Sequence, residues 1–132
     1  MLTPRFLTIE EILWLHDDQI ASFGGTTGVR DLGLLDSALS QPKASFGGEL
    51  LHPTIAEQAA AYLYHLAMNH PFVDGNKRTA LASMEAFILA NGYRLELTND
   101  EVYELVLNVV EGYTSKVELA KNLASVIRHE LL

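Results

Sequence analysis

Apolar side chains recur at helical spacing over most of this chain, and the polar residues between them mark where helices begin. Four segments open with a Ser or Thr followed three residues later by Glu, an arrangement typical of a capping box. In a capping box the hydroxyl and the carboxylate satisfy backbone amides that the first helical turn leaves unpaired. The pattern therefore predicts four helix starts. They are Thr8 with Glu11, Thr54 with Glu57, Thr98 with Glu101, and Ser115 with Glu118.

The first two predicted helices lie in the N-terminal third of the chain. Leu7 and Ile12 stand at the two positions of a hydrophobic staple around the first helix start. This helix should end at the glycine pair at 24–25, because glycine commonly follows the last helical turn. A shorter helix is expected from Asp31 to just before Pro42, because proline disfavours helical backbone in the residue that precedes it.

The segment 79–90 is apolar on nearly every face, with Glu85 as its one charge, and is predicted to be the central buried helix. Two further helices are expected, one ending near Glu111 and one spanning 117–128. Residues 93–97 alternate like a short strand, but no clear β-hairpin signal is present. The chain is therefore predicted to be an all-α bundle of about six helices around a central buried helix.

Length and composition narrow the class of protein. At 132 residues the chain is expected to form one domain, 1–132, that buries roughly two thirds of its unfolded surface. It has no cysteine, so disulfides and thiolate chemistry are excluded. An excess of 17 acidic over 9 basic side chains disfavours direct binding to nucleic acid or membranes. Glu10 and Glu11 interrupt any signal-peptide core, and no apolar run reaches about 18 residues, so we expect a cytoplasmic protein.

One stretch, His-Pro-Phe-Val-Asp-Gly-Asn-Lys-Arg-Thr at 70–79, combines groups that handle phosphate. We expect a loop that leads into the start of a helix, where free amides and the helix dipole attract anions. Gly75 lets the backbone approach a phosphate closely, and Asn76 is expected to cap the helix. Lys77 and Arg78 fall in the first turn, where each cation should cost a few tenths to about 1 kcal/mol against the dipole. A bound anion would explain these two cations.

Two further side chains of this stretch suit catalysis. His70 is a candidate general base for a hydroxyl near neutral pH. Asp74 supplies the carboxylate that a phosphate-bound Mg²⁺ usually requires. Taken singly, these residues also fit structural roles as a helix terminator, a turn, a cap and solvated cations. Their combination in ten residues favours a phosphate-handling site.

The same stretch, HPFVDGNKR at 70–78, resembles the signature of the Fic/Doc family, HPFx[D/E]GN[G/K]R. The opening FLTIEEILWLHDDQIASFGG, the segment GVRDLGLLDSAL and residues 77–92 resemble the smaller death-on-curing (Doc) branch, so the similarity covers nearly the whole chain. The resemblance implies a Fic-like helical fold that uses ATP and Mg²⁺, with Asp74 as the metal ligand. The implied catalytic residues are His70, Asp74, Asn76, Lys77 and Arg78. The implied nucleotide contacts are Phe72, Gly75, Asn76, Lys77 and Arg78.

Two positions favour phosphoryl transfer within this family. Adenylylating members usually carry glycine where Lys77 stands and a second arginine where Leu81 stands. This chain resembles instead the death-on-curing toxin, which binds ATP the other way round and phosphorylates a translation factor, elongation factor Tu. The resemblance thus implies a toxin-like protein kinase that arrests growth. Adenylylation of a protein hydroxyl is the enzymatic alternative, and a non-catalytic module that binds an anion or a partner's carboxylate is the alternative of another class.

The resemblance also implies partners. Many family members carry an inhibitory helix that reads [S/T]xxxE[G/N], but the nearest match here, Thr114 with Glu118, is followed by Leu119. Inhibition by a separate antitoxin protein is therefore expected, in a bacterial or phage toxin-antitoxin pair. Residues 43–48 occupy the place where family members have a flap beside the site that docks an extended target segment. An ordinary glycine-rich loop is the alternative for this segment.

The remaining candidate residues are interpreted as structural. His16 stands beside Asp17 and Asp18, but adjacent helix positions do not face one another, so we expect a solvated face rather than a metal site. Three other histidines have no partner that the sequence identifies: His52, His65 and His129. The side chains expected in the core are Tyr62, Tyr64, Met84 and Phe87.

Overall fold

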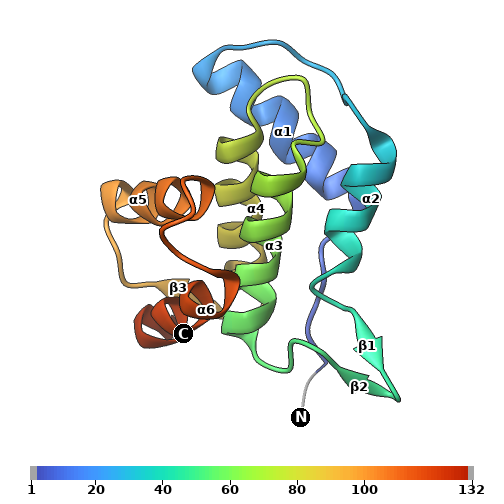
Figure 1. Cartoon of the computed structure of the whole chain (residues 1–132). Helices are drawn as coiled ribbons and strands as arrows, with labels where there is room; N and C mark the ends of the chain where they lie inside the picture. The colour runs from blue at the N-terminus through green and yellow to red at the C-terminus, as the bar shows by residue number, and fades with distance from the viewer. Residues whose placement is uncertain (1–2, 131–132) are drawn as a thin grey trace.

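The computed structural model describes residues 3–130 and confirms a mostly helical fold (Figure 1). Six helices follow one another with short connections, and two small antiparallel strand pairs lie between and after them. The helices are α1 (Ile9–Phe23), α2 (Leu32–Ser40), α3 (Ile55–Asn69), α4 (Asn76–Ala90), α5 (Asn99–Val110) and α6 (Lys116–Val126). The strands are β1 (Ser45–Phe46), β2 (Glu49–Leu50), β3 (Tyr93–Leu95) and β4 (Ile127–His129).

The predicted helix starts are confirmed. Full capping boxes open α1, α5 and α6, where hydroxyl and carboxylate each accept from the other residue's amide. At α3, Thr54 accepts from the Glu57 amide, but the Glu57 carboxylate accepts from the Thr54 hydroxyl and not from its amide. Asp31 caps α2 by accepting from the Leu34 amide. The helix starts are thus encoded locally, as the sequence pattern predicts.

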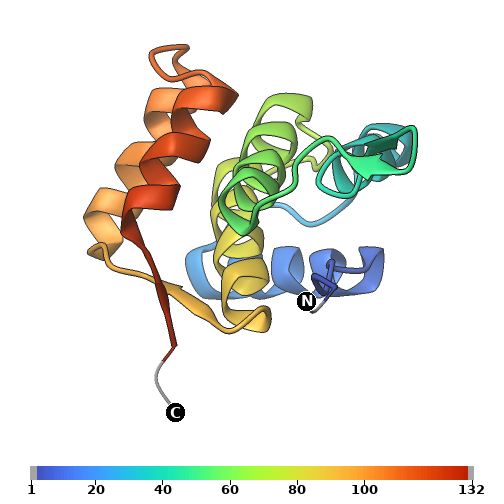
Figure 2. The same cartoon turned by 90° about the horizontal axis from the view of Figure 1, so that it is seen from below.

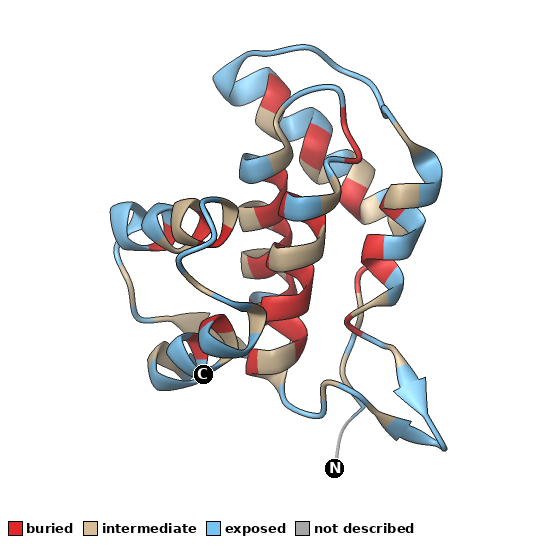
Figure 3. Ribbon diagram, in the orientation of Figure 1, coloured by how far each residue is buried: buried red, intermediate tan, exposed pale blue. Residues whose placement is uncertain are grey.

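The two central helices are α3 and α4, which pack side by side through the middle of the fold (Figure 1, Figure 3). The expectation that 79–90 forms the most enclosed helix is only partly right, because Leu89 of α4 is 59% exposed. The more buried helix is α3, which contacts α2, α4, α5 and α6. Small side chains such as Ala59, Ala60 and Ala67 let these neighbours approach it closely. The four side chains predicted in the core lie there, with Tyr64 partly buried.

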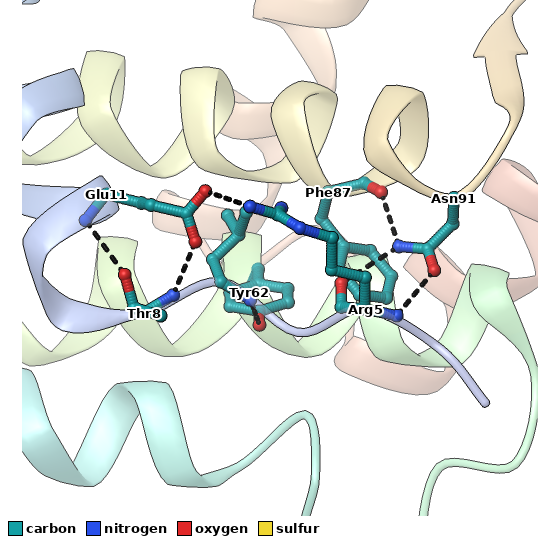
Figure 4. Close-up of polar contacts among 7 residues, drawn as sticks. Arg5, Thr8, Glu11, Tyr62, Phe87 and Asn91 are labelled. Atoms are coloured by element: carbon teal, nitrogen blue, oxygen red, sulfur yellow. Dashed lines mark hydrogen bonds and ion pairs between the residues drawn. The ribbon is translucent and has the colours of Figure 1, made fainter.

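The N-terminal segment is tied across α3 and α4 by polar contacts (Figure 4). The Leu7 amide donates to the buried Tyr62 hydroxyl on α3 at 2.8 Å. The Arg5 backbone exchanges two hydrogen bonds with the Asn91 side chain at the end of α4, and its guanidinium pairs with Glu11 at 2.6 Å. These bonds fix the entry of α1 and so the direction in which α1 runs toward the far end of the bundle.

The predicted end of the last helix is wrong, whereas the short strand expected at 93–97 is confirmed as Tyr93–Leu95. The helix expected to reach Arg128 ends at Val126, and Ile127–His129 instead pairs with Tyr93–Leu95 (Figure 2). Residues 127–129 form a strand because they pair with a segment that is distant in sequence. In addition, the segment 43–50 forms a short hairpin, β1 with β2, although the sequence shows no clear hairpin signal.

The hairpin also lies in a place that the sequence analysis did not expect. A flap was predicted there beside the site, but the hairpin stands near the start of α3, whereas His70 follows its end (Figure 1). The 15 residues of α3 separate the two by about 22 Å, at 1.5 Å per residue. The prediction of a flap at 43–48 beside the site is therefore wrong. Residues 3–130 contain no helix with the length and apolar character needed to cross a bilayer.

Candidate active site

The loop between α3 and α4 begins with a sharp change of backbone direction at His70. This residue ends α3 in the left-handed region, at φ 49° and ψ 55°. Among residues 3–130 it is the one residue other than glycine with a positive φ. Such a conformation costs a side chain about 1–2 kcal/mol. Strain of this kind persists where the surroundings over-determine it, and the His70 side chain is exposed.

The start of α4 differs from the prediction in one detail. Gly75, not Asn76, is the N-cap, at φ 74°, and among the described residues no side chain caps this helix. Asn76 is the first helical residue, and its side-chain amide hydrogen-bonds back to the loop backbone at Phe72. Its Oδ1 accepts from the Phe72 amide at 2.9 Å, and its Nδ2 donates to the Phe72 carbonyl at 3.0 Å. Because Asn76 is occupied in this way, the first-turn amides stay free to bind an anion.

The structure brings most of the predicted site residues together. They line one open hollow of about 290 Å³ at the start of α4. The lining consists of His70, Val73, Asp74, Gly75, Asn76, Lys77, Arg78 and, from α5, Tyr103. Phe72 is the predicted nucleotide contact that does not line it, because its side chain is 1% exposed and lies in the core. Tyr103 was missed, since nothing in its local sequence indicates that α5 reaches this loop.

The Asp74 carboxylate is positioned by two backbone amides. Its Oδ2 accepts from the Thr26 amide at 3.1 Å, and its Oδ1 accepts from the Gly75 amide at 2.9 Å. The group remains exposed, so further lone pairs face solvent. Residues 3–130 contain no cluster of three or more metal-binding side chains. One exposed carboxylate beside an anion site fits Mg²⁺, which takes one or two protein carboxylates and otherwise keeps waters and phosphate oxygens.

The two cations of the first turn have no partner that explains their position. Neither Lys77 nor Arg78 forms an ion pair with another residue in the range 3–130. Both side chains are exposed, and the Arg78 guanidinium lies over the Phe23 ring at 4.6 Å from its centroid. A contact with an aromatic face orients a cation but does not neutralise its charge. The helix start therefore carries an uncompensated positive charge, in a chain whose formal charge is −8.

His16 on α1 packs against the buried side of this loop. The prediction that it belongs to a solvated face is wrong. The residue is 2% exposed, and its ring stacks on Phe72 with centroids 3.8 Å apart. Its Nε2 lies 2.8 Å from the Asp74 carbonyl oxygen, to which it must donate. The sequence does hold a signal for this burial. Ile12, His16 and Ile20 are spaced four apart, which places the histidine on the buried face of α1.

The segment that lies beside the site is 24–30, between α1 and α2. The Val73 amide donates to the Gly28 carbonyl at 3.0 Å, and Val29 forms an isolated antiparallel bridge with Phe72. Together with the bond from Thr26 to Asp74, these contacts run along one edge of the loop. The segment thus occupies the position that was predicted for 43–48.

Arg30 fixes the other end of the loop. Its Nε donates to the His70 carbonyl at 2.7 Å, and its Nη2 donates to the Asn69 carbonyl at 3.0 Å. Carbonyls at the end of a helix have no partner within the helix, so an arginine there both satisfies them and matches the helix dipole. Arg30 therefore holds the backbone of His70 in its left-handed conformation.

Comparison with known proteins identifies similar chains. Residues 6–88 match the family model described as the Fic/DOC family. A protein named "Toxin Doc" from Mycolicibacterium smegmatis is 49% identical over 74 residues, which cover 56% of this chain and 57% of that protein. A protein named "Protein kinase doc" from Escherichia phage P1 is 32% identical over 119 residues, which cover 90% of this chain and 93% of that protein.

Proposed function

The chain belongs to the Fic/DOC family, and on this premise we propose that it is a toxin-type protein kinase, which transfers the terminal phosphoryl group of ATP to a Ser or Thr hydroxyl. One arrangement supports the proposal above all. A histidine, a carboxylate and an uncapped helix start with two free cations line the same hollow. The name of the phage relative, a protein kinase, agrees with this chemistry.

Each group of the site has a role in this reaction. The amides of the α4 start, with Lys77 and Arg78, bind the phosphate oxygens. Asp74 would hold Mg²⁺, which would neutralise charge on the phosphate oxygens. The target hydroxyl oxygen forms a bond to the γ-phosphorus, the bond from that phosphorus to the bridging oxygen breaks, and ADP leaves. His70 accepts the hydroxyl proton and later releases it to water.

Lys77 and Leu81 favour γ-phosphoryl over nucleotidyl transfer. The adenylylating pattern has glycine and arginine at these two positions. Leu81 is partly buried and packs against the core, so the helix offers no second guanidinium to a triphosphate one turn beyond Lys77. Adenylylation remains the enzymatic alternative, and an anion-binding module without activity is the alternative of another class.

Labelled ATP decides among these three. The purified chain is incubated with Mg²⁺, a cell extract and ATP that carries the label on either the α- or the γ-phosphorus. Transfer of the γ-label to protein alone supports the kinase. Transfer of the α-label alone contradicts it in favour of adenylylation, and transfer of neither supports a binding module. Purified elongation factor Tu as substrate then tests the proposed target, and co-purification tests the proposed antitoxin partner.

A further inference from the structure

A separate hollow lies between α6 and the segment 51–57, which leads into α3. Its volume of about 480 Å³ falls within the range of roughly 300–1,000 Å³ that is typical of sites for small molecules. Among the described residues, none lines both this hollow and the candidate active site. One face of α6, with positions three or four apart, forms a wall: Val117, Ala120, Lys121 and Ala124.

Much of the lining is apolar, and its two largest aliphatic side chains are open to solvent. Leu51 is 57% exposed and Val117 is 63% exposed. The small side chains of Ala56, Ala120 and Ala124 leave the space beside them unfilled. Single exposed apolar side chains are ordinary, but two that line the same hollow form a surface that an apolar body would remove from water. The apolar lining therefore suits an aliphatic or aromatic ligand.

The charged groups of the lining leave an excess of one positive charge. Lys116 and Lys121 supply two ammonium groups, and Glu57 supplies one carboxylate. The Glu57 carboxylate accepts from the Thr54 hydroxyl at 2.9 Å and forms no ion pair with a residue in the range 3–130. His52 also lines the hollow, but burial, and then the charge of Lys116, lowers its pKa, so it adds no charge near neutral pH. A ligand with a single negative charge would balance the lining.

Lys116 is the lysine whose charge is not compensated by a neighbour. It stands in the first turn of α6, where the helix dipole disfavours a cation. Its Nζ lies 3.2 Å from Nε2 of His65, whose pKa is lowered to about 4, first by burial, and a neutral imidazole accepts a hydrogen bond without balancing the charge. Burial lowers the pKa of Lys116 as well. Lys121, in contrast, lies close enough to Glu118 for its charge to lower the pKa of that carboxyl.

We propose that this hollow binds a small amphipathic monocarboxylate, in which one carboxylate is joined to an aliphatic or aromatic body. The carboxylate accepts from the Lys116 amine and lies near Lys121, and the body covers Leu51 and Val117. A dianion such as inorganic phosphate is disfavoured, because it would exceed the positive charge left beside Glu57 and would leave the apolar lining in water. This site goes beyond the proposed function, since the transfer reaction does not require it.

Three probes separate the two parts of the ligand. Calorimetry on the full chain measures the binding of octanoate, of octanol, which lacks the charge, and of acetate, which lacks the apolar body. Octanoate is kept below the concentration at which it forms micelles. We expect it to bind about tenfold or more tightly than either of the other two, because a hydrogen bond to a charged group and the apolar burial each contribute more than 1 kcal/mol.

A pair of lysine variants tests the anion contact. Lys116→Gln should weaken octanoate binding by about tenfold or more and leave octanol binding within about twofold of wild type. Lys43→Gln is the matched control, at an exposed lysine that does not line the hollow, and should change neither. Equal weakening by the two variants contradicts the proposal.

Three results with the wild type also overturn the inference. One is the absence of octanoate binding. Another is octanol that binds as tightly as octanoate, because the hollow then recognises apolar surface only. The third is a short peptide ending in leucine that binds more tightly than octanoate, because the occupant is then a chain terminus. None of these results bears on phosphoryl transfer, so the kinase proposal is tested separately.

A second measurement needs no variant, in case Lys116→Gln does not fold. The alanine methyl signals of the wild-type protein are followed by nuclear magnetic resonance during a titration with octanoate. We expect shifts at Ala56, Ala120 and Ala124, whereas Ala21, which is exposed on α1, should not move. Shifts confined to other segments contradict the placement.

Discussion

Each end of α3 lies beside a glycine-containing segment and a histidine, but the two ends differ in how these segments are hydrogen-bonded. At its C-terminal end lie a glycine-containing segment, 24–30, and a histidine loop, 70–76. At its N-terminal end lie the glycine-containing hairpin 43–50 and His52. The segment 24–30 is hydrogen-bonded to the loop at several points, whereas the backbone hydrogen bonds of the hairpin stay within 41–51. What distinguishes the end with the candidate site is thus its long-range hydrogen bonding and not its composition.

A second basic group, formed by His52, His65 and Lys116, has a different electrostatic character from the site. The Lys116 amine lies 3.2 Å from the His65 Nε2. Burial, and then the positive charges of Lys116 and His52, lowers the pKa of His65 to about 4. Burial also lowers the pKa of Lys116. Burial disfavours the charged forms of these groups, whereas the cations of the α4 start are exposed.

The largest expected difference between the two ends comes from their histidines. His70→Ala should lower phosphoryl transfer by roughly 10² to 10⁴ fold, because it removes the proton acceptor. His52→Ala at the opposite end should leave the rate within a few fold of wild type. Single-turnover transfer of γ-label measures both. If His70→Ala transfers at the wild-type rate, the mechanism proposed here is wrong.

A matched pair of glycines tests the role of the segment 24–30. Both Gly25 and Gly48 have positive φ, so a side chain at either position is strained. A Cβ at Gly25 would lie 2.6 Å from the Asp74 Oδ2, whereas a Cβ at Gly48 meets no atom within 4 Å. Gly25→Val should displace the carboxylate and lower transfer by about 10² fold, since misplacement by about 1 Å has effects of this size. Gly48→Val should lose stability only.

The activity of the two glycine variants is compared per folded molecule, with the folded fraction measured by circular dichroism. Titration with Mg²⁺ gives a second criterion. Gly25→Val should require more Mg²⁺ for half-maximal rate, and Gly48→Val should not. Equal activity of the two variants would show that the segment 24–30 does not position the Asp74 carboxylate.

A smaller effect, on the binding of Mg-ATP, is expected from changes at Lys77 and Arg78. Lys77→Glu or Arg78→Glu should weaken Mg-ATP binding by about tenfold or more, yet leave the ligand-free protein equally or more stable, by a few tenths to about 1 kcal/mol. The reason is that an acidic residue in a first helical turn interacts favourably with the dipole. Lys43→Glu on the hairpin is the control and should not affect binding. Thermal melts with and without Mg-ATP give both quantities. A marked loss of ligand-free stability would assign the cations to the fold.

The smallest effect concerns the pH dependence of stability that His65 causes. The lowered pKa of His65, about 4 against about 6.5 unfolded, means that the unfolded chain binds a proton that the folded chain does not. Stability should therefore fall as pH drops from about 6.5 toward 4. Since the side chain is partly exposed, we expect a loss of about 1–2 kcal/mol after allowance for screening. Urea unfolding at several pH values measures it, and His65→Gln should show a smaller loss over this range.

The parts that the sequence predicts are those encoded by neighbouring residues. Helix starts follow from caps three residues apart, and most of the site residues lie within the nine positions of 70–78. Because these residues are close together in the sequence, we could expect them to be close together in the structure. The αL conformation of His70 and the inward side chain of Phe72 were not predicted, because both depend on contacts with α1 and with the segment 24–30.

The parts that sequence reasoning missed depend on distant segments. His16 supports Asp74 from 58 positions away, and Tyr103 reaches the site from α5. The strand at Ile127–His129 exists only because Tyr93–Leu95 lies beside it. The flap was expected at 43–48 because family members have one at that place in the chain, although the segment 24–28 also contains glycines. Which of the two segments lies beside the loop is decided by the packing of α1, α2 and α3 and not by local sequence.

The left-handed backbone of His70 has a consequence for anyone who produces or evolves this protein. Glycine, and to a lesser degree asparagine, adopts this conformation more readily than histidine does. Replacement of the proposed base by glycine should therefore raise the yield of folded protein while it removes the activity. A selection that rewards abundance or heat resistance, or that penalises a harmful product in the host, will favour the same substitution. Cultures that overproduce this chain well should accordingly be sequenced at codon 70 before their protein is assayed.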